Sequence, residues 1–257
     1  MIHLSETDST NSWLRRHADS LPPESLAEMP ACGGCALPAL HVVWTDHQTA
    51  GRGCGTNSWE SEAGMNLLFS VLCRPKTLAA AQQFLLLEAM ALSVKDVIDP
   101  CLPAGDEVKI KWPNDIYWRD CKLGGTLTEC ALSGQQMRWC IIGTGLNINQ
   151  TAFSGTLPNP VSLAQITGVG LPLLPLLKSI TSCFALRLGQ LEQGRSEELQ
   201  AEYLSALYRR SGFHPYRDSV SLFDGEVAAV GSDGTLTLRD RKGNLRRYRF
   251  KELQFVR

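Results

Sequence analysis

The chain has 257 residues, enough for one large domain and a small second one. Its 44% hydrophobic and 20% charged residues are ordinary values for a globular protein, and a net charge of −1 indicates neither a nucleic-acid-binding protein nor a strongly acidic one. The N-terminus lacks the apolar run and cleavage site of a signal peptide, and no stretch approaches the length of a membrane span. These features predict a cytoplasmic protein with reduced thiols.

The cysteines do not indicate a disulfide framework. There are nine, an odd number, scattered through a chain that is too large to need covalent cross-links. Cys32 and Cys35 form a CxxC, but no second ligand pair for zinc stands at a matching distance. A redox CxxC normally opens a helix, whereas this one lies among Gly and Pro residues. We expect a loop over residues 20–38 with two incidental thiols.

Charge is unevenly distributed. Residues 208–257 carry eleven Lys/Arg and six Asp/Glu, a balance of +5, which leaves fourteen against twenty, or −6, for residues 1–207. This asymmetry can steer an acidic partner toward the C-terminal part. The alternative is a small β-rich unit with arginines on its solvated face.

The first half of the chain predicts a short helix, two strands and a long helix. Ser9 or Thr10 can cap the short helix, whose apolar side includes Trp13 and Leu14. Between the two strands lies the polar, glycine-bearing stretch 46–66, and connections of this length are usually functional or disordered. The strands are expected at 41–45 and 67–72, and the long helix, with an apolar centre, at 78–98.

The second half predicts three strands, two helices and a small β-rich domain. Two of the strands flank a turn at Arg119-Asp120. After residue 213 the sequence pattern changes to short β-type runs separated by turns. We therefore place a domain boundary near Ser211-Gly212, giving domains 1–211 and 212–257. The strands are expected at 108–118, 122–130 and 138–146, the helices at 173–191 and 197–208, and the C-terminal runs at 218–223, 226–230, 235–239, 245–250 and 252–256.

Residues 49–61, TAGRGCGTNSWES, are the first of three segments that suggest chemistry. Three glycines alternate with Arg52 and Cys54. A loop of this kind can wrap an anion with backbone N–H groups and one bidentate cation, binding a phosphate or a carboxylate. A flexible surface loop is the alternative.

Residues 111–129, KWPNDIYWRDCKLGGTLTE, are the second. Asn114 and Asp115 follow a proline and are expected on a turn or bulge, where an Asp can hold magnesium or a ribose hydroxyl. Lys122 stands beside Gly124-Gly125 and offers a point charge for an oxyanion or phosphate. A plain hairpin with one solvated lysine is the alternative.

Residues 141–150, IIGTGLNINQ, are the third. An apolar strand ends in Gly-x-Gly before Asn147, so its backbone can pass close to a nucleotide. The third glycine and following helix of a dinucleotide-binding fingerprint are missing. A strand that ends in a bulge is the alternative.

Each of these motifs is a weak signal by itself, but their order along the chain is specific for one protein family. They run from Ser9-Thr10-Asn11 through Gln48, Gly51-Arg52-Gly53, Trp59 and Ser61 to the block Lys111–Ile116 (KWPNDI), and then to Lys122-Leu123-Gly124-Gly125 and Gly143-Thr144-Gly145-Leu146-Asn147. This pattern resembles the biotin–protein ligases, in the short bacterial form without an N-terminal DNA-binding domain. The resemblance covers residues 5–150 closely and the remainder by general layout.

The resemblance implies an α+β fold and a ligase activity. The expected fold is a mixed β-sheet catalytic domain with helices on one side, followed by a small SH3-like β-barrel. The expected activity is activation of biotin with ATP to biotinyl-5′-AMP, and transfer of biotin to a lysine of a biotin carboxyl carrier protein. Magnesium is expected as the metal. Related acyl transfer by a lipoate–protein ligase and a non-catalytic binding module are the alternatives.

The resemblance also assigns site residues. Catalytic roles fall to Lys122, Arg52 and Lys111, around the biotin carboxylate and the α-phosphate. Asp115 is the expected magnesium ligand. Biotin is expected at Ser9, Thr10, Asn11, Gln48, Gly51, Arg52, Gly53, Cys54, Lys122 and Gly125, and ATP at Trp59, Lys111, Asn114, Asp115 and Asn147.

One departure from the pattern concerns the loop after Gly51-Arg52-Gly53. The family usually has further basic residues there, whereas this chain has Cys54-Gly55-Thr56-Asn57. Either Arg52 suffices, or the adenylate is held less tightly.

Family members that repress transcription carry a helix-turn-helix ahead of the catalytic part, for which the motif at residue 9 leaves no room, so we expect no specific DNA binding. A monomer or a homodimer fits the pattern equally well.

Overall fold

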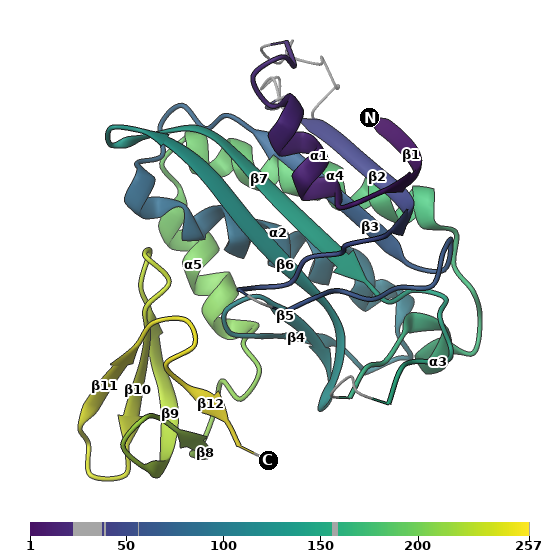
Figure 1. Cartoon of the computed structure of the whole chain (residues 1–257). Coiled ribbons are helices and arrows are strands. Elements are labelled where there is room, and N and C mark those ends of the chain that lie inside the picture. The colour runs from purple at the N-terminus through teal and green to yellow at the C-terminus, as the bar shows by residue number, and fades with distance from the viewer. Residues whose placement is uncertain (23–37, 39, 56, 156–158, 257) are drawn as a thin grey trace.

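The computed structural model describes residues 1–22, 38, 40–55, 57–155 and 159–256. The predicted loop 20–38 with its CxxC lies mostly outside these residues, and Cys32 and Cys35 both do. A seven-stranded mixed sheet forms the larger part of the molecule, and a five-stranded antiparallel sheet forms the C-terminal part (Figure 1).

The large sheet has the strand order β1-β2-β3-β7-β6-β5-β4. Strand β1 runs parallel to β2, and every other neighbouring pair is antiparallel. All seven residues of the apolar β3 are buried, as its place in the middle of the sheet requires. The strands are β1 Ile2–Thr7, β2 His41–Gln48, β3 Leu67–Cys73, β4 Val108–Lys111, β5 Asp115–Trp118, β6 Cys121–Ser133 and β7 Gln136–Leu146.

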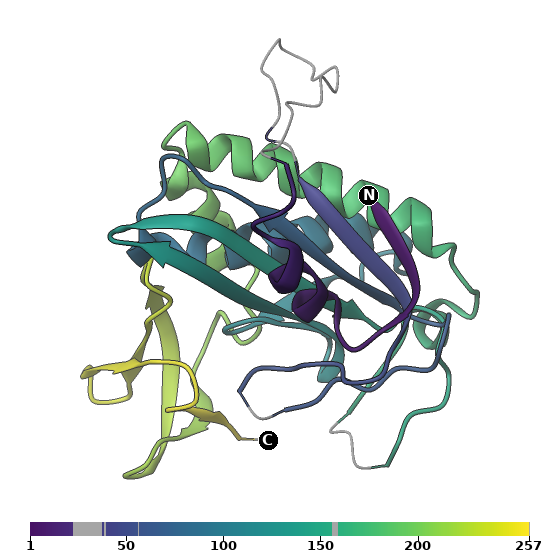
Figure 2. The same ribbon diagram turned by 45° about the horizontal axis from the view of Figure 1, so that its top comes forward.

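Three longer helices cover one face of this sheet, and the short α1 lies on the other (Figures 1 and 2). Side chains alternate along each strand, so Val42 and Val71 pack under the longer helices while Val43 and Leu72 pack against α1. The predicted mixed sheet with helices on one side is thus confirmed, with α1 as an addition. The helices are α1 Thr10–His17, α2 Phe84–Ile98, α3 Leu163–Thr167, α4 Leu173–Glu192 and α5 Ser196–Ser205.

The C-terminal sheet has the order β11-β10-β9-β8-β12 and is antiparallel throughout. This arrangement agrees with an SH3-like domain, although no pairing of β11 with β12 closes the sheet within the described residues. The predicted boundary near Ser211-Gly212 falls between α5 and β8, and the division into two domains stays a prediction. The strands are β8 His214–Arg217, β9 Leu222–Val230, β10 Leu236–Asp240, β11 Leu245–Tyr248 and β12 Gln254–Phe255.

Several predicted boundaries were wrong. The helix expected at 78–98 begins as a 3₁₀ turn at Ala80–Gln82 and becomes α2 at Phe84. The strand expected at 108–118 is two strands, β4 and β5, because the Trp112-Pro113 step turns the chain back on itself. In place of the runs 218–223 and 226–230 there is one strand, β9, which begins only at Leu222, and β1, β8 and α3 were not predicted.

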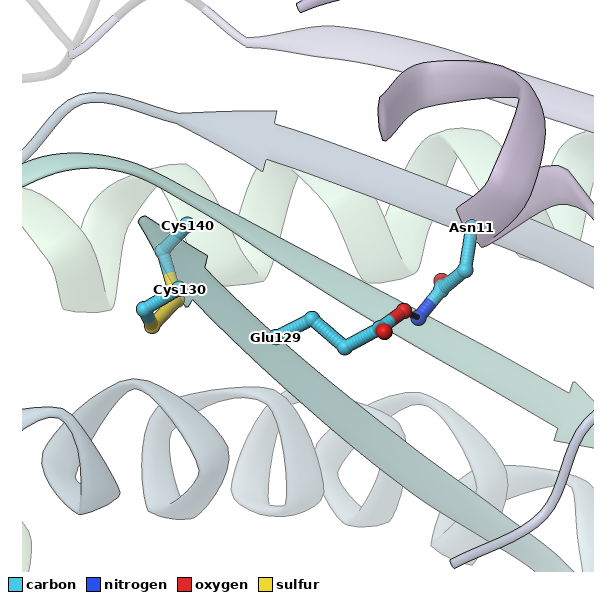
Figure 3. The surroundings of a disulfide bond; sticks show 4 residues. All are labelled: Asn11, Glu129, Cys130 and Cys140. Atoms are coloured by element: carbon cyan, nitrogen blue, oxygen red, sulfur yellow. Dashed lines mark hydrogen bonds between the residues drawn. A yellow bond between two sulfur atoms is a disulfide. The ribbon is translucent and has the colours of Figure 1, made fainter. Parts of the chain in front are cut away.

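The expectation of reduced thiols was also wrong. Cys130 and Cys140 stand opposite each other on β6 and β7 and form a disulfide (Figure 3). Adjacent antiparallel strands bring such a pair within bonding reach, which a scattered cysteine pattern does not reveal. Among the described residues, no helix is long and apolar enough to cross a membrane.

Glu88 is a buried acid at the centre of α2. It is fully buried, and neither carboxyl oxygen has a hydrogen-bond partner. Burial raises the pKa of Glu88 to about 8, because the charged form loses its hydration without gaining a partner. The folded protein therefore keeps Glu88 protonated at neutral pH, whereas the unfolded chain ionises it.

We predict that Glu88→Gln stabilises the protein increasingly as pH rises. The raised pKa means that the contribution of Glu88 to stability is complete below the unfolded pKa, near 4.5, and is lost as pH climbs to about 8. The free energy of unfolding is measured with denaturant for both proteins. The difference between the variant and the parent should grow in favour of the variant by roughly 1.4 kcal/mol per pH unit across this window. Glu197→Gln, at an exposed position of α5, is the control and should show no such divergence. Parallel pH profiles for the parent and Glu88→Gln would contradict the prediction.

Candidate active site

One cavity brings together the four stretches that the sequence singled out. It opens beside the N-terminus of α1, at the ends of β5, β6 and β7, under the loop that follows β2. Its lining is Ser9, Thr10, Asn11, Gln48, Arg52, Gly53, Cys54, Asn57, Ser58, Trp59, Phe69, Asn114, Asp115, Lys122, Gly125, Thr126, Leu127, Gly143, Thr144, Gly145 and Phe250. The segments are distant in sequence, so their convergence is a product of the fold.

The segment Ser9-Thr10-Asn11 enters the cavity at the start of α1, and all three side chains are buried. Gln48, at the end of β2, fixes this segment: its Oε1 accepts from the Thr10 backbone N–H at 2.8 Å and from the Thr10 hydroxyl at 3.2 Å. The parallel pairing of β1 with β2 brings Thr7 opposite Gln48 and so sets this register. Short polar side chains are therefore held in fixed orientations at one end of the cavity.

Asn11 is positioned from both sides. The Ser70 hydroxyl, on β3, lies 2.6 Å from Asn11 Oδ1 and 2.7 Å from the Thr10 hydroxyl. Asn11 Nδ2 donates to Glu129 Oε2, on β6, at 2.9 Å (Figure 3). The disulfide follows Glu129 directly in β6, and because successive side chains alternate, Cys130 points to the opposite face of the sheet.

The two glycines of the predicted Gly-x-Gly end of β7 make room for two different side chains. A Cβ on Gly143 would lie 2.8 Å from Asn11 Cγ, and one on Gly145 would lie 2.6 Å from Trp59 Cε2. Both distances are too short for real contacts. These glycines therefore allow Asn11 and Trp59 to lie flat against the sheet, at opposite ends of the same short stretch of β7.

The glycine-rich loop folds back on itself as a tight hairpin. Gly53 N–H donates to Asn57 O at 2.7 Å, and Trp59 N–H donates to Gly51 O at 3.0 Å. From this hairpin, Arg52 extends to Glu129 and forms an ion pair of 3.0 Å. Glu129 thus accepts from Arg52 and Asn11 together.

Lys122 is the second cation of the cavity. Its Nζ lies 2.6 Å from Asp115 Oδ1 and 5.9 Å from the centre of the Trp59 ring. Gly125 permits this arrangement, because the Lys122–Asp115 pair lies over its bare Cα. Strands β5 and β6 supply the two partners, and their pairing places Asp115 opposite Gly125. A carboxylate therefore holds each of the two lining cations in place.

Three of the residues assigned by resemblance do not line the cavity. Gly51 closes the base of the hairpin. Lys111 Nζ donates to Tyr117 Oη at 3.0 Å and lies over the Phe255 ring, so it faces the C-terminal domain. Asn147 Nδ2 donates to the Val161 carbonyl at 3.1 Å, and its backbone links the end of β7 to the next segments. The expected roles of Lys111 and Asn147 in binding ATP stay predictions. The other assigned residues all line the cavity.

Four residues that matter here were missed by the sequence analysis. Ser70 is a polar residue within the otherwise apolar β3, a pattern that could have drawn attention to it, whereas Glu129 stands among other polar residues of β6. Phe250 lines the cavity and Lys251 touches the hairpin, both from the C-terminal part of the chain, and no local pattern could have placed them there.

No group of three or more His, Cys, Asp or Glu side chains in the described part of the chain could hold a metal. Asp115 offers one carboxylate at the cavity. Magnesium commonly binds through one or two carboxylates together with substrate phosphates, so a single Asp beside a nucleotide fits this ion.

The comparisons with known proteins agree with this geometry. Residues 36–147 match the model of the Biotin/lipoate A/B protein ligase family. The bifunctional ligase/repressor BirA of Bacillus spizizenii is 36% identical over 154 residues, which cover 58% of this chain and 46% of that protein. The chain thus matches about half the length of that relative. The biotin–[acetyl-CoA-carboxylase] ligase of Paracoccus denitrificans is 28% identical over 247 residues, 93% of this chain and 94% of that protein.

Solved structures show the same fold. The biotin protein ligase from Aquifex aeolicus, in complex with biotin and ATP, superposes with a TM-score of 0.75 over 100% of this chain and 98% of that one. Its sequence identity is 22%, so the likeness concerns the fold. The chain thus resembles the biotin/lipoate A/B protein ligase family over residues 36–147, and it resembles the Paracoccus denitrificans ligase in sequence and the Aquifex aeolicus ligase in fold over nearly its whole length.

Proposed function

We propose that the protein activates biotin with ATP to biotinyl-5′-AMP and transfers biotin to a lysine of a biotin carboxyl carrier protein. The observation that carries this proposal is the cavity itself. It is lined by hydroxyl and amide groups held in fixed orientations and by two cations, Arg52, which shares Glu129 with Asn11, and Lys122, which lies near Trp59.

The polar end suits the ureido ring of biotin. A buried ureido group has one carbonyl acceptor and two N–H donors, and all three need partners. Ser9, Thr10, Asn11 and Gln48 supply hydroxyl and amide groups within one small region. Gln48 holds Thr10, and Ser70 joins Thr10 to Asn11, so these groups are preorganised and little conformational entropy is lost when the ligand binds.

The cations suit the first chemical step. A carboxylate oxygen of biotin attacks the α-phosphorus of ATP, the bond from this phosphorus to the bridging oxygen breaks, and pyrophosphate leaves with the electron pair. Both reactants are anions, so positive charge near the new bond lowers the barrier. Arg52 and Lys122 can exchange their carboxylate partners, Glu129 and Asp115, for substrate oxygens.

The second step joins biotin to the acceptor. The neutral ε-amine of a lysine attacks the acyl carbon of the adenylate, AMP departs with the bonding electrons, and the nitrogen loses a proton to give an amide. The hairpin 51–59 covers this part of the cavity. Excluding water here would protect the acyl phosphate from hydrolysis.

The nucleotide is expected beside Trp59 and Asn114. The Trp59 ring rests on the bare backbone of Gly145 and can pack against adenine. Asp115 would hold magnesium, which when bound screens the phosphate charges. The cytoplasmic location, the carrier protein as partner, the absence of specific DNA binding and the oligomeric state stay predictions.

Lipoate ligation is the competing function, since the family model includes both types. The ring of lipoate is an apolar disulfide that offers no N–H group or carbonyl to Thr10, Asn11 and Gln48. Binding lipoate would therefore leave buried polar groups without partners, at about 1–3 kcal/mol for each. This favours biotin.

Pyrophosphate release tests the proposal. The purified protein should release pyrophosphate from ATP when biotin is added, and much more slowly with lipoate. Transfer is then followed by mass spectrometry of a purified biotin carboxyl carrier domain. Faster release with lipoate, or no acid-dependent release at all, would overturn the assignment.

We predict that Lys122→Ala lowers the rate of pyrophosphate release by roughly a hundredfold, as expected for the loss of one cation at the reacting phosphate. Lys178→Ala, at an exposed site of α4, is the matched control and should behave as the parent. Equal rates for Lys122→Ala and the parent would show that the cavity is not where ATP reacts.

A pair of glycine substitutions should separate the two ends of the cavity. Gly143→Ala would push against Asn11 and should raise the KM for biotin, whereas Gly145→Ala would push against Trp59 and should raise the KM for ATP. Displacements of this size cost roughly ten- to a hundredfold. Gly189→Ala, where a Cβ has room, is the control. If both variants shifted the same KM, the division of the cavity would be wrong.

A further inference from the structure

The hairpin that covers the cavity carries little positive charge. Between residues 49 and 61, Arg52 is the single Lys or Arg, and Glu129 already neutralises it at 3.0 Å. Cys54 and Gly55, which follow Arg52-Gly53, carry no charge. The hairpin by itself therefore offers little attraction for the phosphates of a nucleotide.

Lys251 brings a cation to this gap from the other domain. It lies in the turn between β11 and β12, and its side chain rests against Gly55. A Cβ added to Gly55 would overlap the Lys251 ammonium and lie 2.8 Å from Cε. Gly55 also has φ +71°, a backbone conformation that favours glycine. The side-chain space left empty at Gly55 is thus filled by a lysine distant in sequence.

The positive charge of Lys251 is close enough to act on residues that line the cavity. Its neighbour Phe250 lines the cavity together with Cys54. Burial raises the pKa of the Cys54 thiol, Lys251 and Lys122 oppose that rise, and Asp115 adds to it. Both lysines are therefore close enough to act on the same half-buried thiol.

Lys251 differs from the two other cations in having no carboxylate partner. Within the described residues, no Asp or Glu oxygen lies within the 4.0 Å of an ion pair, whereas Arg52 and Lys122 each have one. An unpaired ammonium can bind an incoming anion without first breaking an ion pair.

The backbone of Lys251 is also unfavourable for a lysine. Its φ of +70° is in the left-handed region, where a residue other than glycine carries a conformational cost. Glycine would remove that cost, so some other contribution of the lysine side chain offsets it. Contact with a bound anion would supply one.

We propose that Lys251 is a binding residue of the active site, contributed by the C-terminal domain, and that its ammonium contacts phosphate oxygens of ATP and of the adenylate. This inference rests on the proposed function. Lys251 then replaces the cation that the hairpin lacks, and it joins the C-terminal domain to the loop that retains the adenylate.

Lys251→Gly is the decisive variant, because it removes the charge and relieves the backbone at once. We expect a KM for ATP raised by roughly tenfold and faster escape of biotinyl-5′-AMP into solution, while the melting temperature is unchanged or higher. Lys251→Arg should retain most of the activity. Lys242→Ala, an exposed lysine of the β10–β11 turn, is the matched control and should leave the KM for ATP and adenylate retention at parental values.

Moving the charge back to the hairpin provides a second test. Cys54→Arg introduced into Lys251→Gly should restore the KM for ATP and the retention of the adenylate, since a guanidinium at position 54 faces the same space. A purely structural role of Lys251 would not be rescued in this way.

The outcomes separate the two proposals. If the parent releases no pyrophosphate with biotin and ATP, the proposed function fails. If the parent is active and Lys251→Gly matches it in the KM for ATP and in adenylate retention, the role of Lys251 is refuted. Loss of activity accompanied by a lower melting temperature, without rescue by Cys54→Arg, would also refute that role.

Discussion

Pairing of each lining cation with a carboxylate is the interaction on which the candidate site depends. Arg52 is held by Glu129, and Lys122 by Asp115. Each pair joins segments that the sequence separates widely or that belong to different strands. The pairs keep long, flexible side chains in place before any ligand binds, and they leave the site nearly neutral. An anionic reactant can then replace a carboxylate at a cation that is already in position, so reorganisation during the reaction is small.

The sheet supports this pairing through residues that lack side chains. Gly143 admits Asn11, Gly145 admits Trp59, and Gly125 lies beneath the Lys122–Asp115 pair. Each glycine lets a functional side chain approach the backbone of a central strand. The seven-stranded sheet thereby fixes the positions of Asn11, Trp59 and the Lys122–Asp115 pair, and Phe250, from the C-terminal part of the chain, adds to the cavity lining.

Most helices and strands could be predicted from local patterns, whereas the sheet architecture and most of the cavity lining could be predicted only through the resemblance to the ligase family. The apolar run at Leu67–Cys73 and the capped segment at Ser9-Thr10 carry their own signals of a buried strand and a helix start. Contacts between distant segments could not be predicted. Glu129 acquires its role only when β6 lies beside α1, Lys251 only when the C-terminal domain packs near Gly55, and the Cys130–Cys140 bond only from the register of β6 with β7. Lys111 illustrates the reverse case, because its motif indicated the cavity while its side chain packs toward Phe255.

The most direct test of this account is a crystal structure of the protein with biotinyl-5′-AMP bound. The account predicts the ureido ring among Thr10, Asn11 and Gln48, with the acyl phosphate within hydrogen-bonding distance of Arg52 and Lys122. Those two cations should have turned from Glu129 and Asp115 toward the ligand. An adenylate bound elsewhere, or bound in this cavity while both ion pairs remain intact and distant from its phosphate, would contradict the account.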